Sequence, residues 1–257
     1  MTPPLRITSR DNALLVRLRR LAQDGALYRR LGQIWVEGDH LCRALRARGK
    51  APAMAVISEE AWGQPGLNEL AGWAEKVVVV PGPLFAGFSG LGSPADIGFV
   101  IDLPAPPAIA ADLPTVVLDR VQDPGNVGSI LRSAAAFGVR QVLALAGTAA
   151  LWSPKVLRAG MGAHFTLGLH EGLDDTALQA LHVPLLATSS HAGVFLPQAP
   201  LSWPCAWVLG HEGQGVSAAL LARCALQVRI PQPGGEESLN VAAAAAVCLY
   251  ESQRRLQ

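Results

Sequence analysis

The sequence has little charge and only four cysteines, and it lacks long apolar runs, and these shortages exclude several classes of protein. Charged residues make up 16% of the chain and hydrophobic residues 50%, which excludes a disordered protein and predicts a globular one. No apolar run approaches the roughly eighteen residues that suggest a membrane span. The N-terminal stretch MTPPLRITSRDN lacks the hydrophobic core of a signal peptide. We therefore expect a cytoplasmic protein.

Several functional motifs are also missing. The cysteines are scattered and form no C-x-x-C pair, so we expect buried, reduced thiols and no metal site. No H-E-x-x-H, P-loop or G-x-S-x-G motif occurs. The segment GHEGQG places its glycines at offsets 0, 3 and 5, whereas the dinucleotide fingerprint requires offsets 0, 2 and 5. Metalloenzyme, serine hydrolase and nucleotide-dependent dehydrogenase functions are therefore disfavoured.

The charge is distributed unevenly along the chain. The whole protein carries a net charge of +1, yet residues 1–50 contain eleven Lys or Arg and only four Asp or Glu. A basic N-terminal segment on a mildly acidic body is typical of a module that faces a polyanion such as a nucleic acid. A solvated helix face would give the same count, so charge alone leaves both interpretations open.

A proline-rich stretch, residues 101–115, divides two regions of alternating helix and strand character and has the composition of a linker. Before it, residues 13–32 predict a basic amphipathic helix or a helix pair broken at Gly25. Residues 34–49 predict a short strand that leads into a helix. Further strands are expected at 53–58, 76–80 and 96–103. This pattern indicates a small α/β domain.

After the linker the alternation is stronger and indicates a buried parallel sheet. Its expected strands are apolar on both faces, as such a sheet requires. They are 115–121, 141–147, 184–189, 205–210 and 226–231, with helices expected at 127–137, around 153–161, and at 174–181, 216–223 and 239–255.

Three glycine-rich turns each follow an expected strand and precede an expected helix: DPGNVGS (123–129), GHEGQGVS (210–217) and IPQPGGEESLN (230–240). In the first, Asn126 is a favoured helix N-cap. The carboxyl ends of parallel strands are where open α/β sheets bind ligands, because backbone N–H groups and helix N-termini are exposed there. Three such turns carrying polar side chains predict a binding site at this edge.

The stretches DRVQDPGNVGSILRSAAAFG, VLGHEGQGVS and IPQPGGEESLNVAAAAAVCLYE resemble the three ordered motifs of the SpoU, or TrmH, family of RNA ribose 2′-O-methyltransferases. Residues 153–163 are similar to the segment that connects these motifs. The resemblance covers roughly residues 113–257. More loosely, the N-terminal region resembles the substrate-binding domain, related to ribosomal protein L30e, of many members. The resemblance implies an L30e-like RNA-binding domain over 1–103, a linker over 104–113 and a catalytic domain over 114–257.

The resemblance implies a parallel α/β catalytic domain that ends in a trefoil knot, S-adenosylmethionine as the methyl donor, and a homodimer built through the catalytic domains. It assigns donor binding to Thr188, Gly210, Ile230 and Leu239. It associates activity with Asn126, Arg132, Glu212, Ser238 and Asn240. Each has a simpler interpretation: Asn126 or Ser238 as a helix cap, Asn240 as a local backbone partner, Glu212 as half of an ion pair and Arg132 as a surface residue.

The expected reaction is methylation of a ribose 2′-hydroxyl in a structured RNA, with 23S-type ribosomal RNA favoured over tRNA. A guanidinium group is almost always protonated, so Arg132 is better suited to bind a phosphate or stabilise an alkoxide than to act as a base. Arginines of the basic segment are expected to contact RNA phosphates: Arg6, Arg10, Arg17, Arg19, Arg20, Arg29 and Arg30. A non-catalytic RNA-binding or ribosome-assembly factor with the same fold is the alternative.

Overall fold

The computed structural model describes residues 3–49, 51–90, 95–234 and 238–256. Its residues group into two compact units. The first contains residues 1–105 together with 152–165, and the second contains 106–151 and 166–257. The segment 153–163 therefore groups with the N-terminal unit, although the SpoU resemblance treats it as part of the catalytic region. No helix among the described residues is long and apolar enough to cross a membrane.

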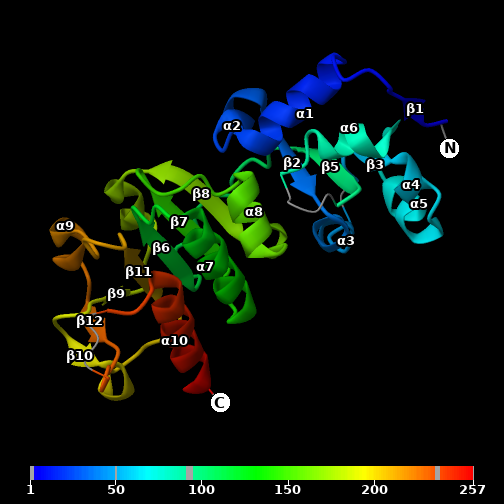
Figure 1. Cartoon of the computed structure of the whole chain (residues 1–257). Coiled ribbons are helices and arrows are strands. Elements are labelled where there is room, and N and C mark those ends of the chain that lie inside the picture. Colours follow the sequence, from blue (N-terminus) through cyan, green and yellow to red (C-terminus); the bar gives the residue numbers. More distant parts are fainter. Residues whose placement is uncertain (1–2, 50, 91–94, 235–237, 257) are drawn as a thin grey trace. The chain divides into compact units, whose positions relative to one another are not determined.

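The first unit is built on a mixed five-stranded sheet in the order β1-β4-β3-β5-β2 (Figure 1). The strands β1, β4 and β3 are parallel, and β5 runs antiparallel to both β3 and β2. The strands are β1 (Leu5–Arg6), β2 (Gln33–Glu37), β3 (Met54–Ser58), β4 (Val77–Val80) and β5 (Ile97–Asp102). The four strands expected from the sequence are confirmed, and β1 is an addition.

The helix pair expected over residues 13–32 is confirmed as α1 (Ala13–Gln23) and α2 (Leu27–Leu31). The helix α1 begins where the Asn12 side chain accepts a hydrogen bond from the Leu14 N–H, and α2 ends at Gly32, which has a left-handed backbone. The expected helix after β2 is α3 (Asp39–Arg46). Three short helices were not expected: α4 (Glu59–Trp62), α5 (Pro65–Ala71) and α6 (Gly82–Ala86). The unit also contains α8 (Pro154–Gly160).

The second unit has a seven-stranded sheet in the order β10-β12-β9-β11-β6-β7-β8, and all of its pairings are parallel. This confirms the predicted α/β class with a parallel sheet. The five expected strands are present, and two edge strands were missed, β8 and β10. The seven are β6 (Thr115–Asp119), β7 (Gln141–Leu145), β8 (Gly168–Leu173), β9 (Leu185–Thr188), β10 (Val194–Phe195), β11 (Ala206–Gly210) and β12 (Leu226–Arg229).

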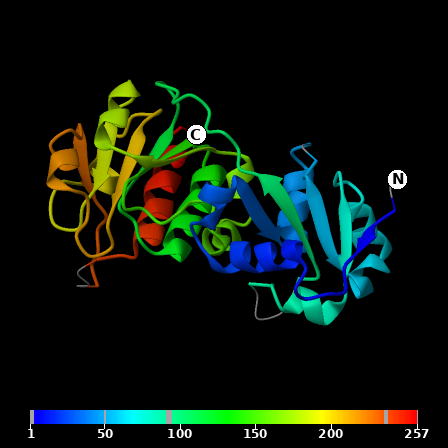
Figure 2. The ribbon, with the colours of Figure 1, turned by 90° about the horizontal axis from the view of Figure 1, so that it is seen from above.

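Two helices of the second unit, α7 (Pro124–Ala136) and α10 (Val241–Arg254), pack side by side (Figures 1 and 2). The fully buried Trp207 of β11 ties α10 to the sheet, because its indole N–H donates to the hydroxyl of Ser252 at 3.0 Å. A short helix, α9 (Ala218–Leu221), follows β11. The helix expected at 174–181 is instead a 3-10 helix over Asp175–Ala180.

One prediction about a helix start is wrong. Asn126 is not the N-cap of α7, because the helix begins two residues earlier at Pro124. The cap is Asp123, whose Oδ1 accepts the backbone N–H of Asn126 at 2.8 Å. Proline suits the first helical turn because its missing N–H would have no partner there. The side chain of Asn126 is thereby released for other contacts.

Candidate active site

The three glycine-rich turns leave strands that lie close together in one sheet. The first follows β6 and precedes α7, the second follows β11 and precedes α9, and the third follows β12 and precedes α10. Since β12, β9, β11 and β6 are consecutive and parallel, the turns after them emerge at the same edge. Residues 235–237 of the third turn lie outside the described residues.

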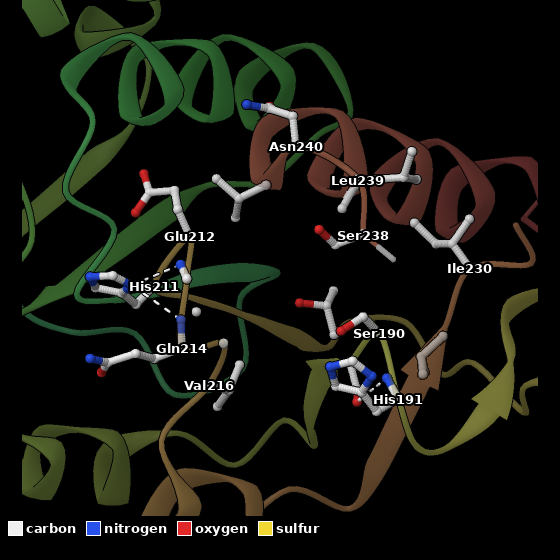
Figure 3. Close-up of a pocket in the computed structure, with 18 of the residues that line it drawn as sticks. Ser190, His191, His211, Glu212, Gln214, Val216, Ile230, Ser238, Leu239 and Asn240 are labelled. Atoms are coloured by element: carbon white, nitrogen blue, oxygen red, sulfur yellow. Dashed lines mark hydrogen bonds between the residues drawn. The ribbon is translucent and has the colours of Figure 1, made fainter. Parts of the chain in front are cut away.

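A cavity of about 580 Å³ opens at this edge (Figure 3), and its volume is in the range typical of small-molecule sites. Three segments contribute most of its wall: the end of β9 with residues 189–191, the loop 210–217, and residues 228–241 in part. Figure 3 shows Glu212, Ser238 and Asn240 around it, with Ser190 and His191 on the segment that follows β9. All four residues expected to bind the donor line it: Thr188, Gly210, Ile230 and Leu239.

The loop 210–217 is folded tightly against itself. His211 and Gly215 exchange backbone hydrogen bonds of 3.1 and 2.8 Å, and the imidazole Nδ1 of His211 accepts the N–H groups of Gly213 and Gln214. A Cβ on Gly210 would lie 2.1 Å from the carbonyl carbon of Gly215. Only glycine allows this close approach of two backbone segments, which explains its place in the motif.

Glu212 connects this loop to the turn before α7. Its carboxylate accepts the backbone N–H groups of Gln122 at 3.1 Å and Asp123 at 3.0 Å, and the side-chain amide of Asn126 at 3.1 Å. The interpretation of Glu212 as half of an ion pair is therefore wrong, because all three of these donors are neutral amides. Two loops separated by some ninety positions in the sequence are held by one side chain.

These contacts change the proton affinity of Glu212. Partial burial raises the pKa of its carboxyl group, but the hydrogen bonds from Asn126 and from the Asp123 and Gln122 N–H groups outweigh burial and lower the pKa to about 2. The carboxylate is therefore ionised at neutral pH and has little tendency to accept a proton. Its geometry suits holding the loops together better than acting as a general base.

Asn240 brings the third turn into the same network. It is the N-cap of α10, and its Oδ1 accepts the N–H groups of Ala242 at 2.9 Å and Ala243 at 3.2 Å. Its Nδ2 donates to the Oδ1 of Asn126 at 2.8 Å. Capping and an interloop contact therefore coexist in one side chain. The interpretation of Ser238 as the cap is wrong, and Ser238 instead lines the cavity.

Arg132 stands apart from the other predicted site residues. It is exposed on α7, outside the residues that line the cavity. Within the described part of the chain its guanidinium group has no hydrogen bond or ion pair. Asn126, Glu212, Ser238 and Asn240 are thus brought together around the cavity, whereas Arg132 is not.

The basic side chains of the first unit are mostly exposed. Arg6 is paired with Glu59 at 2.8 Å, and the Nε of Arg19 donates to the Gly87 carbonyl at 3.3 Å. Arg29 lies against the ring of Tyr28, 5.5 Å from its centroid. The side chains of the others make no hydrogen bond or ion pair with any residue that the structure describes; these are Arg10, Arg17, Arg20 and Arg30.

Sequence reasoning missed several residues of the site. Ser189, Ser190, His191 and Gln232 line the cavity, and the Oε1 atom of Gln232 is buried without a hydrogen-bond partner among the described residues. An unsatisfied buried acceptor inside a cavity is the kind of group that a bound ligand or water would satisfy. A polar run such as TSSH directly after a strand could have pointed to the first three.

No group of three or more His, Cys, Asp or Glu among the described residues could hold a metal ion. Cys42, Cys205 and Cys248 are buried, Cys224 is partly buried, and all four are free thiols. Burial raises the pKa of Cys205 to about 12, so this thiol stays protonated at neutral pH.

The chain is similar to proteins of known family. The profile of the SpoU rRNA methylase family matches residues 114–250. An uncharacterized tRNA/rRNA methyltransferase of Synechocystis is 34% identical over 97% of this chain and 93% of its own length. A 23S rRNA guanosine 2′-O-methyltransferase of Bacillus subtilis is 35% identical over 65% of this chain and 68% of its own length.

Among solved structures, the AdoMet-bound rRNA methyltransferase from Sinorhizobium meliloti has a TM-score of 0.87, with 25% identity over 98% of each chain. The family and the donor found in that structure agree with a cavity built from three glycine-rich turns. The protein is a methyltransferase that uses S-adenosylmethionine and acts on RNA. The chain belongs to the SpoU rRNA methylase family.

Proposed function

We propose that this methyltransferase modifies a ribose 2′-hydroxyl in a structured ribosomal RNA, with 23S-type RNA the favoured target and tRNA the second candidate. The observation that carries the proposal is the convergence of Asn126, Glu212 and Asn240 beside the cavity. The name of the Bacillus subtilis relative supports 23S RNA, and that of the Synechocystis relative leaves tRNA open. A ribosomal substrate is consistent with a cytoplasmic location.

Thr188, Gly210, Ile230 and Leu239 are proposed to hold the donor. The cavity volume suits a small, partly polar ligand, and so does the Oε1 of Gln232, which has no hydrogen-bond partner in the part of the chain that the structure describes. Bound there, S-adenosylmethionine supplies an electrophilic methyl group on its sulfonium. Gly210 contributes its backbone, and Ile230 and Leu239 contribute apolar surface.

Glu212, Asn126 and Asn240 are proposed to fix the geometry of the site. Their hydrogen bonds connect residues that follow β6, β11 and β12, so these three side chains are held together before a substrate arrives. Holding two reactants in line removes much of the entropic barrier to their reaction. The hydroxyl of Ser238 lines the cavity and is proposed to contact the reacting ribose.

Arg132 is proposed to act on the RNA and not on the donor. Its exposed guanidinium group is available for the phosphate next to the target ribose or for the developing alkoxide charge. A charged guanidinium is a poor base, which favours these two roles over proton abstraction.

The N-terminal arginines are proposed to bind the RNA backbone. Arg17 and Arg20 line a second cavity of about 470 Å³ with the apolar side chains of α1 and α2, and the Nε atom of Arg17 is buried with no hydrogen-bond partner within the described ranges. Arg10 and Arg30 are exposed and also lack partners among the described residues. Unpaired guanidinium groups on a basic surface favour binding to phosphate.

We further propose the domain limits, knot and dimer that the family resemblance implies: an L30e-like domain over 1–103, a linker over 104–113 and a knotted catalytic domain over 114–257. The absence of helix and strand from residues 103–114 supports the linker. Two apolar side chains exposed on α10 support a dimer through the catalytic domain, Val247 at 40% and Tyr250 at 55% exposure.

The proposal is tested by mapping ribose methylation across total RNA from cells with and without the protein. Loss of one 2′-O-methyl site in 23S RNA upon deletion, and its restoration by the purified protein with S-adenosylmethionine, is the expected result. If the methylation that disappears lies in tRNA, the substrate is tRNA and not 23S RNA, and the proposed reaction stands. An unchanged map combined with tight RNA binding would favour the non-catalytic assembly factor.

A further inference from the structure

The loop 210–217 is held at a second place by residues to which the motifs assign no role. The contacts come from Asp119, the last residue of β6, and from Arg120, which follows it. Asp119 is only 3% exposed, and its Oδ2 accepts the backbone N–H of Ser217 at 2.7 Å. The end of the loop is thereby fixed to the end of β6.

Arg120 joins Asp119 to the middle of the same loop. Its Nε donates to Asp119 Oδ1 at 2.9 Å, and its Nη1 donates to the side-chain oxygen of Gln214 at 3.0 Å. Gln214 lines the donor cavity from within the loop. The guanidinium group therefore connects a buried carboxylate to a cavity-lining side chain.

The backbone of Arg120 has a left-handed conformation, with φ of 60°. Residues with a Cβ avoid this conformation, and glycine adopts it without penalty. Glycine would therefore suit the backbone here, yet the sequence has arginine, whose side chain makes the contacts described above. Unfavourable backbone geometry that a side chain offsets is characteristic of functional sites.

We propose that Asp119, Arg120 and Gln214 form a brace that holds the loop 210–217 in the shape that receives S-adenosylmethionine, which makes Arg120 a positioning residue for donor affinity. The inference rests on the donor site proposed above. Without the guanidinium group, Gln214 loses its hydrogen bond to the residue that follows β6, and the loop can leave the cavity wall. The brace acts on donor binding and leaves the Glu212 network intact.

Arg120→Gly is the sharpest test, because it removes the guanidinium contacts of the brace and at the same time places glycine, which tolerates the left-handed backbone, at this position. We expect the KM for S-adenosylmethionine and its calorimetric Kd to rise about tenfold, as loss of a charge-assisted hydrogen bond would produce. The kcat and the KM for RNA should change little, and the melting temperature should hold or rise. Arg140→Ala removes an exposed arginine of the same unit without a side-chain partner among the described residues, and should alter none of these quantities.

A double-mutant cycle separates the brace from a direct contact between Gln214 and the donor. Gln214→Ala should raise the donor Kd, and combining it with Arg120→Gly should add little further. Additive effects would show that the two side chains act independently, and would overturn the brace. An unchanged donor Kd in Arg120→Gly would also overturn it, as would a lower melting temperature with parallel losses in kcat.

The wild-type titration distinguishes failure of the brace from failure of the site. If the full-length protein binds S-adenosylmethionine and the Arg120→Gly variant binds it equally well, the donor site stands and the brace is wrong. If the wild-type protein gives no heat of binding, the proposed donor site fails and the brace fails with it.

Discussion

Polar side chains are hydrogen-bonded in the turns around the proposed donor cavity, whereas on the basic helices of the first unit most of them are not. At the cavity, Glu212 accepts three hydrogen bonds and Asn126 bonds both Glu212 and Asn240. On α1 and α2, the guanidinium groups of Arg17, Arg20 and Arg30 have no hydrogen bond or ion pair with the described residues.

The difference reflects two kinds of recognition. A site that transfers a methyl group gains from being ordered beforehand, because a displacement of about 1 Å can cost a hundredfold in rate. A surface that binds a polyanion gains from unpaired cations, since counterion release supplies the affinity and precise geometry matters less. Under the proposed function, the protein therefore combines an internally hydrogen-bonded reaction site with a charged surface whose partners would be RNA phosphates.

The largest effect is expected from a substitution that removes hydrogen bonds between the turns. Asn126→Ala removes the amide that joins Glu212 to Asn240, and we expect kcat to fall about a hundredfold because the three turns lose their common link. Single-turnover kinetics at saturating donor and RNA measures the change. Gln122→Ala is the matched control, since this exposed residue of the same turn contributes only its backbone N–H to Glu212. Activity near that of the wild type in Asn126→Ala would contradict the preorganised site.

Arg132 tests whether the comparison holds within the second unit, because its guanidinium group has no hydrogen bond or ion pair with the described residues although α7 follows one of the glycine-rich turns. Arg132→Lys keeps the charge and loses the planar pair of donors, so we expect kcat to fall about tenfold with the donor Kd unchanged. Turnover near that of the wild type would argue against both proposed roles of the guanidinium group, phosphate binding and stabilisation of the alkoxide.

The charged surface is tested by ionic strength. Replacing both Arg17 and Arg20 with Ala should reduce the slope of log Kd for RNA against log salt by about 1.5, because each phosphate contact contributes about 0.7–0.9. Filter binding across a range of KCl concentrations measures it. Arg43→Ala is the control, because Asp39 already holds this guanidinium group at 2.6 Å. Equal slopes in the wild-type and double-variant proteins would make these arginines an ordinary solvated face.

Acid should weaken the hydrogen bonds that Glu212 accepts, because it protonates the carboxylate. The pKa of Glu212 is about 2 in the folded protein, below its ordinary value near 4.5, so the folded state binds the proton less readily than the unfolded chain. Its contribution is complete above pH 4.5 and is lost as the pH falls through the folded pKa near 2. Because solvent screens this site, we expect the ionised carboxylate to contribute at most about 1 kcal/mol to the free energy of unfolding. The test measures the unfolding free energies of the wild type and of Glu212→Gln at pH 7 and at pH 3, and the difference between the two proteins should be smaller at pH 3. A pH-independent difference would contradict the role of Glu212.

The smallest effect is expected at His170 in β8. This buried side chain differs from the hydrogen-bonded polar groups around the cavity. It is 5% exposed, its Nε2 has no hydrogen-bond partner among the residues that the structure describes, and burial lowers its pKa. The neutral imidazole is favoured in the folded state, so its contribution to stability is complete at pH values above the ordinary histidine pKa near 6.5. This contribution is lost as the pH falls through the lowered pKa of the folded protein. His170→Phe should flatten the pH dependence of unfolding free energy between pH 7 and 5. A slope equal to that of the wild type would show that His170 does not cause it.

Much of the architecture could be predicted, because it depends on local patterns. Runs such as TVVLD are apolar on both faces, and this pattern indicated the parallel strands correctly. The edge strands were missed for the converse reason: β8, with the sequence GLHEGL, mixes polar and glycine residues, and β10 is only two residues long. The N-cap of α7 was misplaced because Asp123 and Asn126 are both good caps, and only the folded turn decides between them.

The sequence by itself determined the helices and strands, the uneven charge and the family motifs, because these depend on neighbouring residues and their order. Only the tertiary structure decided that Glu212 binds the turn before α7, that Arg132 stays outside the cavity, and that Arg120 reaches Gln214. Residues 86 to 114 positions apart are involved in such contacts, among them Asn126 with Glu212 and Asn126 with Asn240. Their proximity follows from the order in which parallel strands are placed in the sheet, and no local pattern in the chain encodes that order.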